Sequence, residues 1–384
     1  MGWNLFGRKK VGGFERNQRA IREAGGGETL PVQDTRAAIE ELSQVVKNDP
    51  EAVEIYLALG SLYRSQGEIE RAIQIRNSLI VRPGLDREFK ARALFELGRD
   101  FRRGGFLDRA EKAFTDSRAH GYDPAAIQYE MARLASERGA YEKAAEAYGQ
   151  LGLPLPQAHY LVRLAMDYFE EGNDSQAHRA LRHAIRAYPG SVEAWLEQLI
   201  QAYKAGSERK VADILKNALV SVAPELRFVL LEGLLQALDR AERERAVPAL
   251  AEDARWANAC GEEALTRALL PVIESQEPDV LLLYYGAAFL LRISDEDNAR
   301  AWLEKALVLH PDFWLARLEL FELSRQDQTL TPFFKEQLSF FMDRARKVHR
   351  FFCRRCGLKR DQLFFTCPRC RSWHSIAFRT DFSQ

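Results

Sequence analysis

The chain has 384 residues, of which 46% are hydrophobic and 29% charged, enough for a packed core and for more than one structural unit. Lysine plus arginine and aspartate plus glutamate each total 55, so the formal net charge is zero. No global field therefore draws the protein to nucleic acid or anionic lipid. No segment has the run of about eighteen apolar residues that a membrane-spanning helix needs, and no apolar signal-peptide core is present. As written, the chain is expected to be soluble.

Residues 1–30 predict a basic, juxtamembrane-like tail and linker. Trp3 and Phe6 precede a basic cluster at residues 8–10, and this is the flank expected just inside a membrane anchor. A disordered basic tail is an equally good interpretation. The glycines at 25–27 then form a flexible break before the ordered part of the chain begins.

From residue 31 to residue 348, helical patterning returns with a fixed period. Glycines recur at separations of 38, 34, 33 and 34 residues, and a small residue follows each glycine five positions later. The glycines are Gly67, Gly105, Gly139, Gly172 and Gly206, and the small residues are Ala72, Ala110, Ala144, Ala177 and Val211. This period is that of the tetratricopeptide repeat, a hairpin of two helices. A small side chain at the second position lets the second helix pack closely on the first.

Further marks of the repeat support this interpretation. Leu59-Gly60 and Leu97-Gly98 fit a first helix, and prolines fall where one repeat ends and the next begins. These are Pro50, Pro83, Pro124, Pro189 and Pro311. The pattern is blurred between about residues 224 and 277, and residues 332–348 predict a last, capping helix. Because a lone hairpin cannot bury its apolar face, the hairpins must stack into an all-α, right-handed superhelical solenoid with a concave groove.

Arginines cluster on the expected concave side of the solenoid. The repeat template places five there: Arg64, Arg99, Arg102, Arg103 and Arg133. Arginine clusters capture acidic segments and chain termini, so these residues form a candidate partner-binding groove. The alternative is a solvated face whose arginines are balanced by neighbouring carboxylates.

Four cysteines near the C-terminus have the spacing of a metal site. Cys353 and Cys356 form one C-x-x-C pair, and Cys367 and Cys370 form a second pair after ten intervening residues. Two such pairs can hold one Zn or Fe ion at the centre of a tetrahedron and leave no open position, so the site is structural. Gly357 and Pro368 help the backbone to turn around the sulfurs. Clustered free thiols are one alternative, which spacing this regular does not favour. Disulfides are the other, which a chain without a secretory signal does not favour.

The same C-terminal segment, residues 349–384, is locally basic. Eight arginines or lysines stand against two aspartates there, and four thiolates on a divalent ion would balance part of this excess. Phosphate-binding loops and hydrolase motifs are absent from the sequence. The protein is therefore not expected to be an enzyme.

A tetratricopeptide array that ends in this four-cysteine module resembles the lipopolysaccharide assembly protein B family of Gram-negative bacteria. The specific part is the ending, with aromatic residues before Cys353-x-x-Cys356-Gly357, an aromatic pair, and Cys367-Pro368-x-Cys370 followed by a tryptophan. The resemblance implies that Cys353, Cys356, Cys367 and Cys370 are the ligands of a rubredoxin-like metal-binding domain.

The resemblance also implies a function. Members of this family are inner-membrane proteins whose repeats face the cytoplasm, and they bring the deacetylase that commits lipid A synthesis to an FtsH-type membrane protease. This chain is then expected to be a non-enzymatic adaptor that restrains lipopolysaccharide synthesis. One surface would hold the substrate, while another would meet the protease or a membrane regulator.

Two departures from the family pattern qualify what the resemblance implies. The family's transmembrane helix is not found before Gly2-Trp3, and Arg371 stands where rubredoxins place glycine. Two other functions fit the same residues: a zinc-ribbon scaffold that binds nucleic acid, suggested by the basic residues near Phe364 and Phe365, and an iron-containing redox protein. No nucleic acid is expected under the leading hypothesis. The sequence leaves the oligomeric state open, a homodimer included.

Overall fold

The computed structural model describes residues 37–44, 53–246, 256–326 and 329–381. The predictions about the tail at residues 1–30 and about Pro50 lie outside these residues. The chain divides into two compact units, Met1–Leu161 and Val162–Gln384. Each unit is described here by itself.

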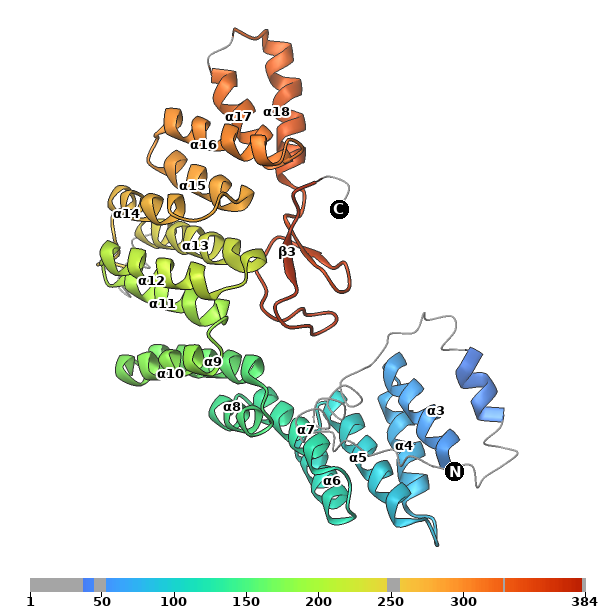
Figure 1. Ribbon diagram of the computed structural model, residues 1–384. Helices are drawn as coiled ribbons and strands as arrows, with labels where there is room; N and C mark the ends of the chain where they lie inside the picture. The colour runs from blue at the N-terminus through green and yellow to red at the C-terminus, as the bar shows by residue number, and fades with distance from the viewer. Residues whose placement is uncertain (1–36, 45–52, 247–255, 327–328, 382–384) are drawn as a thin grey trace, which may run out of the picture. The chain divides into compact units, whose positions relative to one another are not determined.

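The first unit is built from helical hairpins (Figure 1). After a short helix at residues 37–44, the helices are α3 (Val53–Gln66), α4 (Ile69–Ile80), α5 (Arg87–Arg103), α6 (Leu107–Ala119), α7 (Pro124–Glu137) and α8 (Tyr141–Gln150). The helix α9 (Pro154–Glu170) spans the boundary between the units. Helices α3 and α4, α5 and α6, and α7 and α8 pack as pairs, and these pairs are the predicted repeats.

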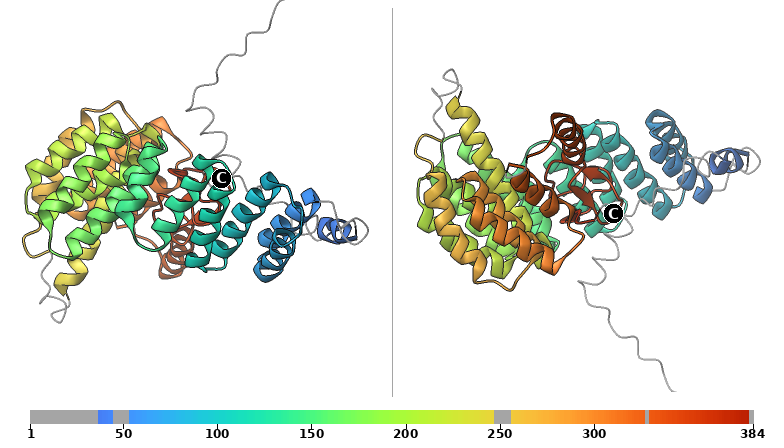
Figure 2. Two further views of the ribbon diagram at one scale, coloured as in Figure 1. Left: turned by 90° about the horizontal axis from the view of Figure 1, so that it is seen from below. Right: turned by 90° about the horizontal axis from the view of Figure 1, so that it is seen from above.

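The second unit continues the same pattern and adds a small sheet. Its helices are α10 (Asp174–Ala187), α11 (Val192–Lys204), α12 (Glu208–Ser221), the 3-10 helix η1 (Pro224–Leu226), α13 (Arg227–Ala246), α14 (Glu262–Glu274), α15 (Val280–Arg292), α16 (Glu296–Leu309), α17 (Trp314–Gln326) and α18 (Pro332–Arg346). Two further directions show the helices α11 to α16 packed side by side (Figure 2). The predicted fold class, an all-α tetratricopeptide-repeat solenoid with a C-terminal four-cysteine module, is confirmed.

The periodic glycines make the turn inside each hairpin. Gly67, Gly105, Gly139, Gly172 and Gly206 all have positive φ angles, between 71° and 83°, a conformation that costs a glycine least. The next residue donates its N–H to the carbonyl five residues back, as Glu68 does to Tyr63 at 2.9 Å. In the α15–α16 hairpin Ser294 takes this place, with φ of 59°, and Asp295 donates to Leu290.

The small residues five positions after each turn are fully buried. Ala72, Ala110, Ala144, Ala177 and Val211 each have 0% exposure. The approach of the two helices is close: a Cβ atom added to Gly98 of α5 would lie 2.6 Å from the ring of Phe114 on α6. Alanine and glycine at these positions therefore set the spacing of the hairpins.

The stretch in which the repeat is blurred keeps the same arrangement. α13 packs against α11 and α15, while α14 packs against α12 and α15. α13 therefore takes the place of a first helix and α14 that of a second helix. A close approach is found between α13 and α11, since a Cβ atom on Gly233 would lie 2.5 Å from Leu196.

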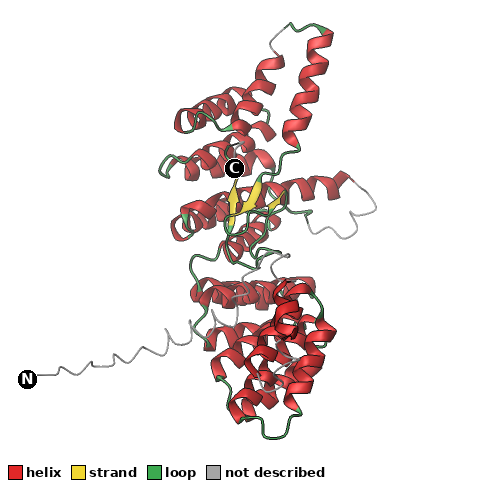
Figure 3. Cartoon of the chain, turned by 90° about the vertical axis from the view of Figure 1, so that its right-hand side faces the viewer, coloured by secondary structure: helices red, strands yellow, loops and turns green. Residues whose placement is uncertain are grey.

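The C-terminal module is a three-stranded antiparallel sheet, drawn in yellow in Figure 3. Its strands are β1 (Phe351–Cys353), β2 (Lys359–Arg360) and β3 (Ile376–Phe378), in the order β2-β1-β3. Phe351 pairs with Phe378, and Cys353 pairs with Ile376. Because side chains alternate along a strand, Phe351 and Cys353 share one buried face of β1.

Candidate metal centre

The four cysteines of the module converge on one point. The sulfur atoms of Cys353 and Cys370 are 3.6 Å apart, those of Cys356 and Cys367 are also 3.6 Å apart, and all four lie within 4.8 Å of one another. Four sulfurs at a tetrahedral distance of about 2.3 Å from one ion would be about 3.8 Å apart. A disulfide would require about 2.05 Å. The arrangement is therefore compatible with one tetrahedral metal ion.

Two similar turns position these sulfurs. In the first, Gly357 donates its N–H to the carbonyl of Cys353 at 2.9 Å, and in the second Arg371 donates to the carbonyl of Cys367 at 2.8 Å. Both residues that close the turns have positive φ angles, 69° for Gly357 and 55° for Arg371. Arg371 thus adopts the backbone conformation of the glycine that it replaces.

Two serine hydroxyls that the sequence analysis overlooked contact the sulfurs. The Cys353 thiol donates to the Ser375 hydroxyl at 3.2 Å, and the Ser372 hydroxyl lies 2.9 Å from Cys370 Sγ. Burial opposes ionisation of Cys370, but the hydroxyl and backbone N–H of Ser372 lower the pKa of this thiol to about 6. The pKa of Cys353 is also lowered, because the Ser375 hydroxyl and nearby N–H groups outweigh burial. These contacts favour the thiolate forms of Cys353 and Cys370 even without a bound cation.

The pKa of the Cys356 thiol shifts in the opposite direction. Burial and the neighbouring thiols raise the pKa of this thiol to about 12. A cation at the centre would supply the positive charge that Cys356 needs to ionise. The donor set, four convergent sulfurs with hydrogen-bonded partners, fits a metal ion that is held structurally.

The module is fixed to the helices through an aromatic cluster. The ring of Phe378 lies 5.6 to 6.2 Å from the rings of Phe228, Tyr284, Phe313 and Phe351. Phe228, Phe313 and Phe351 are at most 1% exposed. Cysteines 353 and 367 belong to the same continuous core as the helices of the second unit. The sheet is therefore part of this unit's core, not a separate body.

A buried ion pair reinforces the contact. Arg350, just before β1, donates to both carboxylate oxygens of Glu232 on α13, which is 3% exposed. The Tyr285 hydroxyl also donates to Glu232, at 3.0 Å. Nothing in the sequence pattern marked Glu232 as a partner of the module.

Two further contacts hold the C-terminal segment against the helices. The indole N–H of Trp314 donates to the carbonyl of Arg379 at 3.1 Å. The side chain of His374 is 8% exposed, with its Nε2 atom 3.6 Å from Glu193 Oε1 and its ring beside Tyr188. His374 therefore packs against α11 and is not among the clustered metal-ligand candidates.

The predicted groove arginines lie in the first unit, and the structure gives four of them carboxylate partners. Arg64 contacts Glu96 and Asp100, Arg99 contacts Glu96, Arg102 contacts Glu130 and Glu137, and Arg133 contacts Glu130. Their side chains are 8 to 17% exposed. Arg103 is exposed. These pairs connect α3 to α5 and α5 to α7. That a partner binds here stays a prediction.

A fully buried arginine completes this network. Arg76 on α4 has 0% exposure and contacts Asp100, the Leu57 carbonyl and the Ser61 hydroxyl. It stands four residues after Ala72, where the next repeat has Phe114 in the same relation to Ala110. This break in the hydrophobic pattern was the available signal for Arg76.

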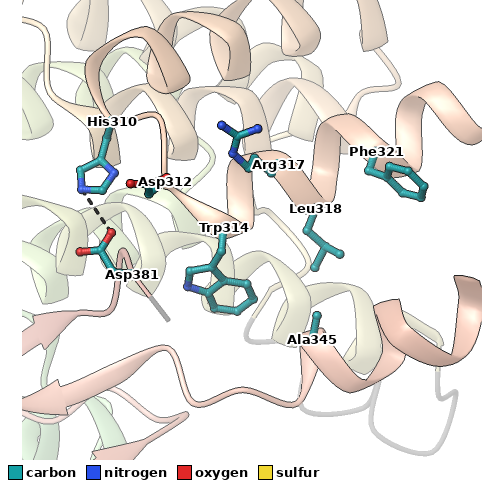
Figure 4. Close-up of a pocket in the computed structure, with 8 residues that line it drawn as sticks. All are labelled: His310, Asp312, Trp314, Arg317, Leu318, Phe321, Ala345 and Asp381. Carbon is teal, nitrogen blue, oxygen red and sulfur yellow. Dashed lines mark ion pairs between the residues drawn. The ribbon is translucent and has the colours of Figure 1, made fainter. Parts of the chain in front are cut away.

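A hollow of about 850 Å³ lies between α17, α18 and the C-terminal segment (Figure 4). Leu318 and Phe321 from α17 and Ala345 from α18 line it. At its edge His310 Nε2 is 3.5 Å from Asp381 Oδ1. Its lining contains no cysteine, serine or lysine that could serve as a nucleophile.

Of the aromatic residues that suggested nucleic acid binding, Phe364 is buried, whereas Phe365 and Trp373 are partly exposed. Phe364 is 7% exposed, and base stacking requires an accessible ring. Among the basic residues, Arg350 is engaged with Glu232, and Arg354 donates to the carbonyl of His374. The nucleic-acid hypothesis stays a prediction.

Comparisons with known proteins agree with the repeat pattern. The tetratricopeptide repeat family model matches residues 32–82 and 95–157. Solved structures with a similar fold include MamA, with 24% identity over 40% of this chain and 89% of that chain and a TM-score of 0.33. A tetratricopeptide repeat protein from Parabacteroides merdae has 18% identity over 71% of this chain and 98% of that chain, with a TM-score of 0.35.

Curated relatives match over most of the chain. Lipopolysaccharide assembly protein B of Escherichia coli (strain K12) is 26% identical over 352 residues, which cover 88% of this chain and 84% of the relative. The protein of the same name from Haemophilus influenzae is 25% identical over 353 residues, 87% of this chain and 82% of the relative.

The repeats and the cysteine cluster together define a tetratricopeptide-repeat protein with a C-terminal four-cysteine module. Its fold and its relatives fit a protein that is not an enzyme. The repeats, the four-cysteine cluster and the similarity to curated relatives over most of the chain support its assignment to the lipopolysaccharide assembly protein B family. Among the helices that the structure describes, none is both long enough and apolar enough to cross a membrane.

Proposed function

We propose that this protein is a non-enzymatic adaptor that regulates lipopolysaccharide synthesis at the cytoplasmic face of the bacterial inner membrane. It presents the deacetylase of the lipid A pathway to an FtsH-type protease. The observation that carries the proposal is the joining of repeat helices and four-cysteine module in one core, in a chain whose curated relatives are named for lipopolysaccharide assembly. Such a scaffold acts by raising the local concentration of its partners.

The ion in the proposal is zinc, held by Cys353, Cys356, Cys367 and Cys370. Zinc has no redox chemistry, and a closed four-sulfur site contributes folding free energy directly. Iron is the alternative metal. Purified protein that is colourless and contains zinc would support the proposal, whereas a reversible iron couple would favour the redox alternative.

The partner-binding surface in the proposal is the concave side of the first unit. The repeat template places Arg103 on this side, and its side chain is exposed. The neighbouring arginines, although paired with carboxylates, retain some exposure. An acidic segment of a partner would compete for these arginines. Replacing Arg103 by Glu should weaken capture of the deacetylase, and Arg109→Glu, on the surface of α6, is the matched control.

Turnover of the deacetylase in cells tests the function. In cells depleted of the protein, the half-life and the level of the enzyme should rise, and restoring the wild-type chain should reverse this. Unchanged turnover in depleted cells would remove the proposal, whichever proteins are captured with the chain.

A further inference from the structure

The last helix, α18, presents an unusual number of aromatic rings to solvent. Phe333, Phe334, Phe340 and Phe341 are 71%, 52%, 59% and 65% exposed, whereas Met342 is the buried residue of this helix. Counting about 100° per residue, the four phenylalanines fall within an arc of about 120° on one side of the helix. Phe340 and Phe341 contact each other edge to face, with ring centroids 5.6 Å apart.

This aromatic face is not what the end of a repeat array needs. A terminal repeat normally presents a polar outer face, which keeps the array soluble. Clustered exposed aromatic residues mark a surface that is covered in use. We therefore expect another molecule or surface to cover the phenylalanine face of α18.

The charges on α18 indicate the kind of occupant. Arg344 and Lys347 are exposed in and just after the last turn, and Lys335 is exposed beside Phe334. The acidic residues Glu336 and Asp343 fall together on a flank of the helix outside the phenylalanine arc. Cations next to aromatic rings are complementary to a surface with an apolar interior and anionic groups at its edge.

We propose that α18 lies in the interface of an anionic phospholipid surface, with its phenylalanine face in the acyl boundary. Basic residues beside a phenylalanine face are a feature of interfacial helices, and on α18 Arg344 falls within the phenylalanine arc and Lys347 about 20° outside it. The long side chains of Arg344 and Lys347 reach the phosphates while the rings enter the apolar layer.

The proposal deepens the proposed adaptor function, since it names a surface through which the adaptor would touch the membrane, but it rests on α18 alone. Its test is therefore separate. Vesicle binding by the purified chain reports on α18, and turnover of the deacetylase reports on the adaptor function.

The test is flotation of the full chain with vesicles of phosphatidylethanolamine and phosphatidylglycerol. To keep the basic tail from masking the effect, Arg8, Lys9 and Lys10 are replaced by Gln in every variant. Replacing Phe340 and Phe341 by Ser should weaken binding by about tenfold or more. Phe106→Ser, a half-exposed phenylalanine of the first unit, is the matched control and should bind as the parent does.

A charge variant completes the test. Arg344→Gln with Lys347→Gln should weaken binding to these vesicles but leave any weak binding to phosphatidylcholine vesicles unchanged. Binding that is unchanged in the Phe340 and Phe341 variant would overturn the proposal. A second result would also overturn it: the parent chain is a dimer in solution, and the Phe340 and Phe341 variant is a monomer that still binds vesicles. The phenylalanine face would then be covered by a second copy of the chain.

Discussion

Arg350 and Glu232, which are 118 residues apart in the chain, form the ion pair that joins the metal module to the helices. The guanidinium nitrogens lie 3.0 and 3.3 Å from the two carboxylate oxygens. Glu232 is 3% exposed and also accepts a hydrogen bond from the Tyr285 hydroxyl. Burial beside this carboxylate raises the pKa of Tyr285 well above its ordinary value, so the phenol stays protonated as a donor.

Replacing Arg350 by Met should loosen the module. Glu232 would be left buried without its cation, which costs about 3 kcal/mol at a half-buried pair. Hydrogen exchange of β1 and β3 should become faster, whereas Arg355→Met, at an exposed position of the module, should leave it unchanged. Equal exchange rates in the two variants would show that the pair does not hold the module.

Replacing Cys367 by Ser should remove the ion and destabilise the second unit. Cys367 is fully buried, and the module shares its core with the helices of this unit. A structural zinc site contributes on the order of 10 kcal/mol to folding. Limited proteolysis should then cleave the C-terminal module and expose neighbouring helices, while the first unit stays resistant. The matched variant Cys260→Ser, at a buried cysteine outside the cluster, should retain the ion, and a resistant C-terminus in Cys367→Ser would contradict this account.

Replacing Ser294 by Gly should stabilise the protein. Ser294 holds a φ of 59° in a turn that the earlier hairpins make with glycine. Glycine removes the steric cost of the left-handed conformation but gains chain entropy in the unfolded state. The net effect should raise the free energy of unfolding by about 1 kcal/mol. The reciprocal change Gly172→Ser, at a position with φ of 78° and open space around it, should destabilise by a similar amount. Urea denaturation measures both, and a loss of stability in Ser294→Gly would refute the assignment of the turn.

The first unit should lose stability in acid through Glu96. Burial alone would raise the pKa of this carboxyl, but Arg64, Arg99 and Arg76 lower it to about 2, from an ordinary value of 4.5. Since the folded-state pKa is the lower one, the stabilisation is complete above about pH 4.5 and is lost as the pH falls toward 2. Glu96 contributes about 3 kcal/mol to the free energy of unfolding in this way. Hydrogen exchange of α5 amides between pH 6 and pH 3 should show this slope, and Glu96→Gln should flatten it. An identical slope in that variant would assign the effect to other carboxylates.

Much of the fold could be predicted because hairpin packing is local and periodic. A turn needs a residue that tolerates positive φ, and close helices need a small residue, so Gly105 and Ala110 recur with the repeat. Ser294 interrupts the glycine series, although Ala299 five residues later keeps the alanine series. The residue type changed there while the backbone conformation did not.

The metal ligands could be predicted for a similar reason, since two C-x-x-C turns must present sulfur at short range. The contacts that fix the module could not. Glu232 lies on α13, where the repeat is blurred, and no period relates it to Arg350. Long-range pairs of this kind follow from the tertiary arrangement of the chain and leave no regular mark in the sequence.

The central claim of this account is that four cysteines share one ion and make the module a fixed part of the second unit. X-ray absorption at the metal edge, together with the metal content of the purified chain, tests it most directly. One ion per chain with four sulfur neighbours at about 2.3 Å is the expected result. A chain free of metal, or one whose sulfurs are joined at about 2.05 Å as disulfides, would contradict the claim.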